Sequence, residues 1–141
     1  MTDLYGASPL EWVPIVRRAR IDLKLKAACL IFASYAEVTV INGYQPGERI
    51  YVGIARFATD CDVSYPTAQR YLRWMREVGL IELVKRGSPQ LRLNDEYRLT
   101  LSIETITTIK APTPDQYKIL IDDAITQNRR RQNHRHHPGD V

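Results

Sequence analysis

The feature that most constrains the fold of this chain is a change of hydrophobic period at Gly79. From Tyr65 to Val78, apolar residues recur every three or four positions, which is the period of an amphipathic helix. After Gly79, apolar and polar residues alternate, once over 81–84 and again over 97–104, which is the period of half-buried strands. The sequence therefore predicts a helix that is followed directly by two strands.

A long basic segment, "KRGSPQLRLND" (85–95), joins the two predicted strands. Its glycine and proline favour a turn, so the strands should form a hairpin with an extended tip. Between Leu83 and Arg92 the chain carries Lys85, Arg86 and Arg92 and no carboxylate. The tip of the hairpin is therefore expected to be positively charged.

Two more helices and a short strand are predicted before this hairpin. Residues 20–37 and 54–61 should form helices, with a turn-rich stretch (41–48) and a short strand (49–54) between them. In the first of these helices, the expected buried positions are Leu23, Ala27, Leu30, Ile31, Ser34 and Tyr35. The order helix, strand, helix, turn, helix, hairpin is that of a winged helix-turn-helix, an α+β fold with a three-helix core and a small antiparallel sheet.

The N-terminal residues 1–19 are expected to be an extension of the predicted domain, which covers 20–104. The segment "SPLE" is typical of a helix start, because Ser8 can cap the first turn and Pro9 fits the first helical position. Pro14 has no N–H to donate within a helix, so this helix should be short.

The C-terminal residues 105–141 should form a helix, at about 114–130, and a basic tail that is disordered at its end. A second capping box marks the start of this helix, with Thr113 as N-cap and Pro114 at the first helical position. One face of the helix is apolar and comprises Tyr117, Leu120, Ile121, Ala124 and Ile125. This face either packs on its own domain or forms a homodimer.

The composition fits a globular protein without membrane segments. Of the 141 residues, 44% are hydrophobic and 26% are charged. The longest apolar run, "AACLIFA" (27–33), is far shorter than the roughly 18 residues of a membrane span. No secretory signal is visible at the N-terminus, so we expect a cytoplasmic protein. In that compartment Cys29 and Cys61 should be free thiols, with a disulfide as the alternative.

The predicted helix from Tyr65 to Val78 has one apolar and one polar face when it is wound at about 100° per residue. The packing face comprises Ala68, Tyr71, Leu72, Met75, Val78 and Gly79, and the opposite face comprises Pro66, Gln69, Arg70, Arg73 and Glu77. Tyr65 and Arg76 lie at one edge of the polar face, and Trp74 lies at the other. Glutamine and arginine can form paired hydrogen bonds with adenine and guanine in the major groove of DNA.

The segment "ARFATDCDVSYPTAQRYLRWMREVGLIELV" (55–84) resembles the winged helix-turn-helix DNA-binding proteins, especially the small regulators of actinobacterial phages and mobile elements. The matching positions are "GLIE" at the entry to the wing, Ala58, Cys61, Val63, Ser64, Ala68 and Leu72. The segment "DEYRLTL" (95–101) is similar to the returning strand of the wing, so the resemblance covers about residues 20–102. Asp62 stands where the family often has glycine, and Pro66 lies near the start of the second helix; both residue types are compatible with those positions.

This resemblance implies a recognition helix over 65–78 that binds the major groove of double-stranded DNA. The residues that contact bases would be Gln69, Arg70, Arg73 and Tyr65. The DNA backbone or the flanking minor groove would be contacted from the helix by Ser64, Thr67 and Arg76, and from the wing (84–94) by Lys85, Arg86 and Arg92. The function implied is that of a sequence-specific transcriptional regulator of a phage or mobile element.

The alternative function is that of a protein-binding adaptor, since a winged helix can also act on a recombination or replication complex. Trp74, Tyr65 and the apolar face of the C-terminal helix would then contact the protein partner. The tail "RRRQNHRHH" (129–137) is either a non-specific nucleic-acid arm or a solvated run of charge.

No catalytic or metal-binding motif stands out in the sequence. His134, His136 and His137 match no zinc spacing and have no cysteine nearby, so neither a metal nor another cofactor is expected. There is no P-loop, no nucleophile elbow and no plausible pair of catalytic carboxylates. We therefore do not expect an enzyme.

Overall fold

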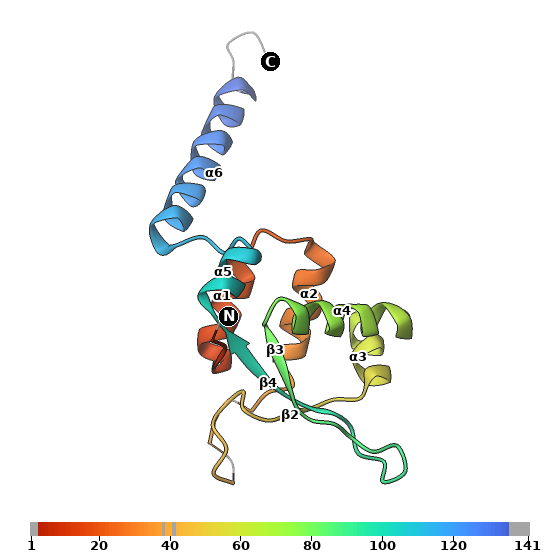
Figure 1. The fold of residues 1–141 in the computed structure, drawn as a ribbon. Helices are drawn as coiled ribbons and strands as arrows, with labels where there is room; N and C mark the ends of the chain where they lie inside the picture. Colours follow the sequence, from red (N-terminus) through yellow and green to blue (C-terminus); the bar gives the residue numbers. More distant parts are fainter. Residues whose placement is uncertain (1–2, 38, 41, 136–141) are drawn as a thin grey trace. The chain divides into compact units, whose positions relative to one another are not determined.

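The computed structural model describes residues 3–37, 39–40 and 42–135, and it divides into two compact units between Ala111 and Pro112 (Figure 1). In the described residues, the first unit contains five helices and a four-stranded antiparallel sheet, and the second contains one long helix. The mixed α+β class predicted from the sequence is thus confirmed. None of the helices in this part of the chain has the length and apolar character needed to cross a membrane.

The elements alternate between short strands and helices along the chain. The first unit comprises β1 (Tyr5–Gly6), α1 (Pro9–Arg18), α2 (Leu23–Ala33), β2 (Ile50–Tyr51), α3 (Ile54–Cys61), α4 (Tyr65–Glu77), β3 (Ile81–Lys85), β4 (Glu96–Leu101) and α5 (Ile103–Thr108). The second unit comprises α6 (Pro114–Arg135).

The central strand of the sheet is β4. β3 runs antiparallel along one edge of it, with Ile81 opposite Leu99, and forms the hairpin that the sequence predicted. β2 and β1 share the other edge, with β2 beside the start of β4 and Tyr5 of β1 opposite Leu101 near its end. β4 therefore joins three segments that are far apart in the sequence.

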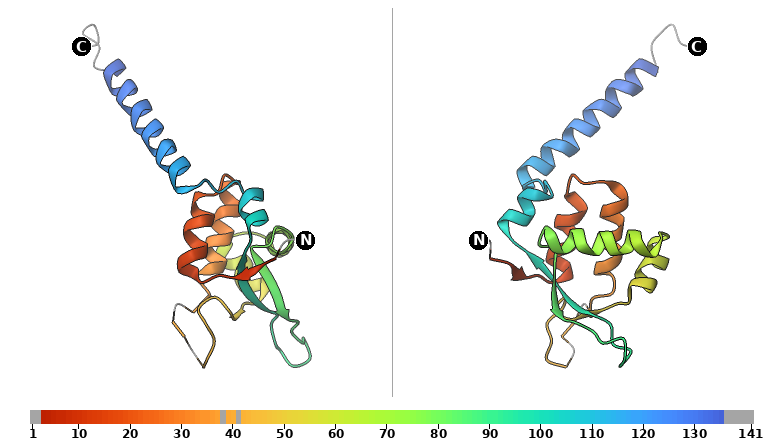
Figure 2. Two further views of the ribbon diagram at one scale, coloured as in Figure 1. Left: turned by 60° about the vertical axis from the view of Figure 1, so that its left-hand side comes forward. Right: turned by 45° about the vertical axis from the view of Figure 1, so that its right-hand side comes forward.

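The core lies between the sheet and the helices. Phe32 of α2 packs edge-on against Phe57 of α3 and Tyr97 of β4, with ring centroids 5.8 and 5.7 Å apart. Trp12 of α1 is fully buried, and its indole N–H donates a hydrogen bond to the carbonyl of Leu80 at 2.9 Å. α1 and α2 lie side by side, and α4 crosses beside α2 (Figure 2). These contacts hold the junction between α4 and β3 in place.

The N-terminal segment is part of the first unit, not the extension that was expected over 1–19. β1 pairs with β4, and α1 buries both Trp12 and Val16. These two residues are four positions apart on one helical face, so the face needs a partner to cover it. The sheet and α2 provide that cover.

Pro14 does not end α1, contrary to the prediction. Ser8 caps this helix as expected, because its Oγ accepts a hydrogen bond from the Glu11 N–H at 3.4 Å. Pro14 removes the donor for the carbonyl of Leu10, a residue that is 83% exposed, so water can bind that carbonyl instead. The helix continues to Arg18 because the burial of its apolar face outweighs one missing hydrogen bond.

The helix α2 buries mainly a different face from the one predicted, although Leu30, Ile31 and Tyr35 of the predicted set are half-buried against the core. Its buried residues are Ala28, Cys29, Phe32 and Ala33, whereas Leu23 and Ala27 are exposed. Because "LKLKAACLIFA" carries apolar residues nearly all round, its sequence does not specify which face packs. The helix is also shorter than the predicted 20–37, since the Asp22 carboxylate caps its first turn by accepting from the Lys24 N–H at 3.1 Å.

The boundary of the first unit lies later than the predicted residue 104. The alternating residues 97–104 predicted a strand as far as 104, but β4 ends at Leu101 and α5 begins at Ile103. Ser102 caps α5, because its Oγ accepts a hydrogen bond from the Thr105 N–H at 2.9 Å. Ile109 follows α5 and is fully buried. The unit accordingly extends to Ala111.

The helix α6 begins where the sequence predicted. Thr113 and Gln116 form the reciprocal bonds of a capping box, with the Thr113 N–H donating to Gln116 Oε1 at 3.0 Å and the Gln116 N–H donating to Thr113 Oγ1 at 3.2 Å. The helix runs to Arg135, beyond the predicted end near 130. The expected disordered end of the tail, with His136 and His137, lies outside the described residues.

The turn between α3 and α4 depends on a left-handed residue at Asp62. Its backbone angles are φ 55° and ψ 46°, and its N–H donates to the last turn of α3. The next N–H, that of Val63, donates to the Ala58 carbonyl at 3.0 Å. This is a common way to end a helix, and it sets the direction in which α4 starts.

Asp62→Gly is expected to leave stability within about 1 kcal/mol of the natural chain, because glycine tolerates the left-handed conformation while the unfolded state gains freedom. Asp62→Val should lower the free energy of unfolding by roughly 1–2 kcal/mol, since a branched side chain disfavours a positive φ. Urea unfolding followed by far-UV circular dichroism measures both. Equal midpoints for the valine variant and the natural chain would contradict the assigned role of this turn.

Candidate nucleic-acid interface

The helix α4 presents the polar face that the sequence predicted. Ala68, Leu72 and Met75 are buried against the core. The outer face is exposed and carries Pro66, Gln69, Arg70, Arg73 and Glu77, with Tyr65 and Arg76 also exposed at its edge. Trp74, at the other edge, is half-buried and packs against the core. The exposed side of α4 thus displays a row of amide and guanidinium groups.

A chain of hydrogen bonds orders the N-terminal end of this face. Ser64 caps α4, because its Oγ accepts from the Thr67 N–H at 3.3 Å, and its hydroxyl donates to Thr67 Oγ1 at 3.0 Å. Arg70 donates from Nη2 to the same oxygen at 2.8 Å. Since that oxygen already accepts two hydrogen bonds, the proton of the Thr67 hydroxyl is left to donate outward. Thr67 and Arg70 are therefore better placed than Ser64 to bind an anion.

Residues 86–95 form the hairpin loop between β3 and β4, which projects from the sheet (Figure 1). The Gly87 N–H donates to Asp95 Oδ1 at 2.7 Å, and the Leu93 N–H donates to the Ser88 carbonyl at 2.9 Å. A side chain at Gly87 would place its Cβ 2.2 Å from the carbonyl oxygen of Leu93, so the two sides of the loop approach too closely for any other residue. The loop therefore has a fixed shape.

The hairpin loop lies next to the start of α4. Tyr65 of α4 and Arg92 of the loop line the same hollow, together with residues at the start of α3. Burial and the nearby Asp95 carboxylate raise the pKa of Tyr97, and the positive charges of Arg76 and Arg86 oppose that rise. Arg92 of the loop and the N-terminal end of α4 thus border one surface.

The cations of this surface form no ion pair with a carboxylate among the described residues. Ion pairs within 4 Å elsewhere in the first unit join Arg98 to Glu82 at 3.1 Å and Arg49 to Glu96 at 2.5 Å. Neither pair involves α4 or the hairpin loop. The arginines of this surface therefore remain available to an external anion.

Arg73 and Arg76 border a hollow between α4 and β3 that also contains acids. Glu77 and Glu82 line this hollow together with apolar residues. Glu82 is the acid already paired with Arg98. The charges of Arg73 and Arg76 are therefore partly offset by these two carboxylates in the hollow.

Lys85, at the end of β3, lies opposite Glu96 of β4. Burial of Glu96 opposes its ionisation, but hydrogen bonds from Tyr51 and Arg49 and the charges of Arg49 and Lys85 outweigh burial and hold its pKa below the usual value. The Arg49 guanidinium also stacks on the rings of Tyr44 and Tyr51, at 4.5 and 4.8 Å from their centroids. Glu96 is paired with Arg49, and the Lys85 side chain is exposed.

The apolar face predicted on the C-terminal helix is exposed to solvent within the second unit. Leu120, Ile121, Ala124 and Ile125 are exposed there, and Tyr117 is half-buried. Ile119 is also exposed, although it was not part of the predicted stripe. Ile119 lies on the opposite side of the helix from this stripe, so it does not widen the predicted face, and no residue of α6 covers that face.

The two cysteines are free, as expected, and the buried Cys29 thiol is poorly reactive as a nucleophile. Burial raises the pKa of the Cys29 thiol to about 12, so little thiolate forms near neutral pH. Cys61 is half-buried. Among the described residues, no three side chains of His, Cys, Asp or Glu come together as a metal site would require.

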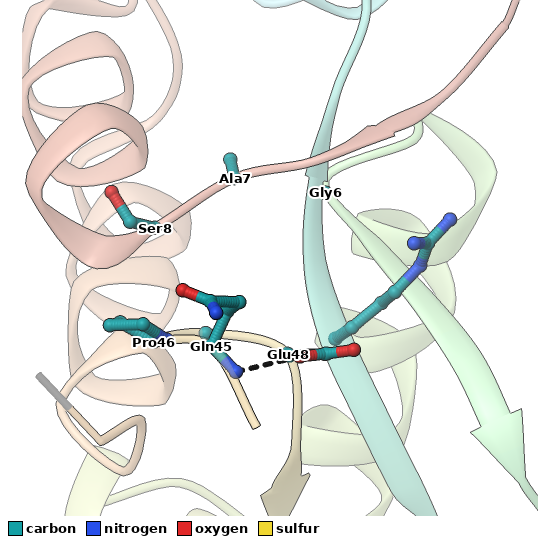
Figure 3. Close-up of a pocket in the computed structure, with 8 residues that line it drawn as sticks. Gly6, Ala7, Ser8, Gln45, Pro46 and Glu48 are labelled. Atoms are coloured by element: carbon teal, nitrogen blue, oxygen red, sulfur yellow. Dashed lines mark hydrogen bonds between the residues drawn. The ribbon is translucent and has the colours of Figure 1, made fainter. Parts of the chain in front are cut away.

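A separate hollow lies where the N-terminal segment meets the turn before β2 (Figure 3). Two of its polar groups are engaged within the protein, since Ser8 caps α1 and Glu48 Oε2 accepts from the Gln45 N–H at 2.7 Å (Figure 3). Arg98 also lines this hollow, and its buried Nε has no hydrogen-bond partner among the described residues. Gly47 has a φ of +79°, and a Cβ there would lie 2.5 Å from the carbonyl oxygen of Ala7. We assign this hollow to the packing of two segments against each other.

Sequence reasoning missed two exposed leucines in the hairpin loop. Leu91 is 71% exposed and Leu93 is 53% exposed, on either side of Arg92. The charge of this segment predicts a basic tip and says nothing of these leucines. The alternation Leu–Arg–Leu was the signal that could have identified a loop tip with both apolar and basic side chains.

Comparison of the chain with protein-family models, with curated proteins and with solved structures gave no match. The interface described above therefore rests on the residues of this chain alone.

Proposed function

We propose that this protein binds double-stranded DNA sequence-specifically, as a winged helix-turn-helix in which α4 is the recognition helix and the hairpin loop is the wing. The observation that carries the proposal is the outer face of α4. Gln69, Arg70 and Arg73 are exposed together on it, and neither arginine is paired with a carboxylate of the described residues. These side chains are the ones that bond to adenine and guanine edges in the major groove.

The order and pairing of the elements support this proposal. α3 and α4 are joined by a tight turn at Asp62, and the hairpin of β3 and β4 follows directly. A helix about 10–12 Å across fits a major groove that is about 12 Å wide. With α4 in the groove, Arg86 and Arg92 of the adjacent loop are suited to the flanking phosphates or minor groove.

The biological role proposed for this binding is transcriptional regulation in a phage or mobile element. It rests on the resemblance of residues 55–84 to small regulators of that kind. Replication or excision factors would use the same DNA contacts, and the position of the preferred site relative to a promoter distinguishes them.

Selection of bound duplexes from a random pool is expected to enrich one sequence motif. Binding of the full chain to that motif should weaken steeply with salt, with log K falling by about 0.9 per phosphate contact for each tenfold rise in salt. Arg86→Ala should weaken binding evenly across sequences and reduce this slope by about one contact. Fluorescence anisotropy titrations at several salt concentrations measure both effects.

Arg20→Ala is the matched control for this experiment. Arg20 is exposed on the connection between α1 and α2, at the end of the first unit away from the hairpin loop (Figure 1). Its removal should leave the salt slope unchanged. A pool that yields no motif, together with binding that is insensitive to salt, would overturn the proposal.

The open apolar face of α6 favours protein docking as a second candidate function. Exposed Leu120, Ile121 and Ile125 could pair with a second copy of this chain or with another protein. A palindromic motif in the selection would indicate a homodimer. If no salt-dependent DNA binding is found, an adaptor that acts on a recombination or replication complex becomes the better interpretation.

A further inference from the structure

The tip of the hairpin loop exposes apolar side chains in a setting that is otherwise basic. Leu91 is 71% exposed and Leu93 is 53% exposed, and Val84 at the base of the loop is also exposed. Between 83 and 92 the chain carries three cations and no carboxylate. Leucines grouped on a narrow projection leave apolar area in water that a binding partner would cover.

The tip is held in one conformation before any partner binds. The Arg92 N–H donates to the Pro89 carbonyl at 3.2 Å, and the Leu91 N–H donates to Ser88 Oγ at 3.4 Å. Arg92 has a φ of 54°, a left-handed conformation that is unfavourable for a residue other than glycine. Strain of this kind is commonly found in functional loops, where it fixes the direction of a side chain. Leu91 and Leu93 are therefore displayed on a preorganised support.

We propose that Leu91 is an apolar wedge that enters the DNA minor groove beside the site read by α4 and bends the duplex there. This inference rests on the proposed DNA-binding function and adds a deformation of the DNA to it. Proteins that bend DNA through the minor groove insert leucine or a similar side chain between base steps and use arginine beside it. Leu91 and the adjacent Arg92 provide that combination of side chains.

The position of the tip favours DNA over other anionic partners. Arg92 lines the same hollow as Tyr65 at the start of α4, so a duplex bound along α4 would continue past the loop. Opening a base step costs a few kcal/mol, and the contacts that the bent duplex gains would offset this cost. Flexible pyrimidine–purine steps should therefore occur in the preferred site where the loop lies.

The test measures binding and bending of the same duplex. Fluorophores at the two ends of a duplex that carries the selected site report the end-to-end distance by energy transfer, while anisotropy reports binding by the full chain. The natural chain is expected to bend the duplex by about 20–90°. Leu91→Ala should reduce the bend angle by at least half and weaken binding by no more than about tenfold.

Leu10→Ala is the matched control, because Leu10 is an exposed leucine on α1. It should leave both the bend angle and the affinity unchanged. Unaltered circular dichroism of both variants excludes a loss of fold as the cause.

Two results would overturn the wedge while leaving DNA binding intact: an unbent duplex in the complex with the natural chain, or an equal bend with Leu91→Ala. Binding to vesicles that contain phosphatidylserine, lost in Leu91→Ala while the DNA bend persists, would also overturn it and would assign the tip to a lipid surface. Absence of any DNA binding would instead refute the proposed function itself, together with the wedge.

Discussion

Trp12→Ala is expected to lower the free energy of unfolding by about 3–5 kcal/mol, the largest effect of any substitution considered. The ring is fully buried between α1 and the sheet, and its removal leaves a cavity. It also removes the donor that the buried Leu80 carbonyl uses at 2.9 Å. Since small domains are stable by only about 5–15 kcal/mol, this loss is a large part of the total.

Urea unfolding followed by far-UV circular dichroism is the appropriate measurement, because Trp12 is one of two tryptophans and its loss would alter fluorescence directly. Trp12→Phe retains an aromatic ring, removes the N–H and leaves a smaller cavity than alanine does, so it should cost about 1–3 kcal/mol. Leu10→Ala, on the exposed side of the same helix, should stay within about 0.5 kcal/mol of the natural chain. A Trp12→Ala variant as stable as the natural chain would contradict the role of Trp12 in the core of the first unit.

Arg70→Ala and Arg73→Ala are each expected to weaken binding to the preferred DNA site by about 1–3 kcal/mol, or roughly 5- to 150-fold. Both side chains lie on the exposed face of α4, and Thr67 holds the Arg70 guanidinium in place through a 2.8 Å hydrogen bond. Removal of a base contact should affect the preferred site more than unrelated sequences. The ratio of the two affinities should therefore fall.

Competition titrations with specific and scrambled duplexes measure this ratio. Arg86→Ala, in the hairpin loop, should reduce both affinities by the same factor and leave the ratio unchanged. Arg20→Ala should affect neither. If Arg70→Ala and Arg73→Ala also leave the ratio unchanged, then α4 does not read bases, and these arginines act on the DNA backbone or only solvate the helix.

The order of elements from α3 to β4 could be predicted from the sequence because each carries a clear local signal. α4 has buried residues at helical spacing and a polar opposite face, and the turn before it contains Asp62 and a capping serine, Ser64. α2 and α5 lack such signals. α2 is apolar nearly all round, so only its neighbours decide that Phe32 faces inward and Leu23 outward. The β-branched residues of α5 favour a strand, but the hydrogen bond from the Thr105 N–H to Ser102 Oγ stabilises the first turn of a helix.

The candidate site was predictable in its residue types and less so in its geometry. The exposed positions of Gln69, Arg70 and Arg73 followed from helical periodicity alone. The hydrogen bonds from Ser64 and Arg70 to Thr67 did not, because they depend on rotamers. The proximity of Tyr65 and Arg92 also could not be inferred, since it depends on how the hairpin loop folds back.

The central place of β4 in the sheet has a consequence for the synthesis of the chain on the ribosome. β1, β2 and β3 each form their ladder with β4, which is the last strand to be made. The contacts of α3 with α4 are local and can form early, whereas β1 must wait for a partner near the other end of the unit. A nascent chain that stops in the hairpin loop would leave three strands with unpaired edges, which favours aggregation. Completion of β4 is therefore the step at which the growing chain can first close its fold.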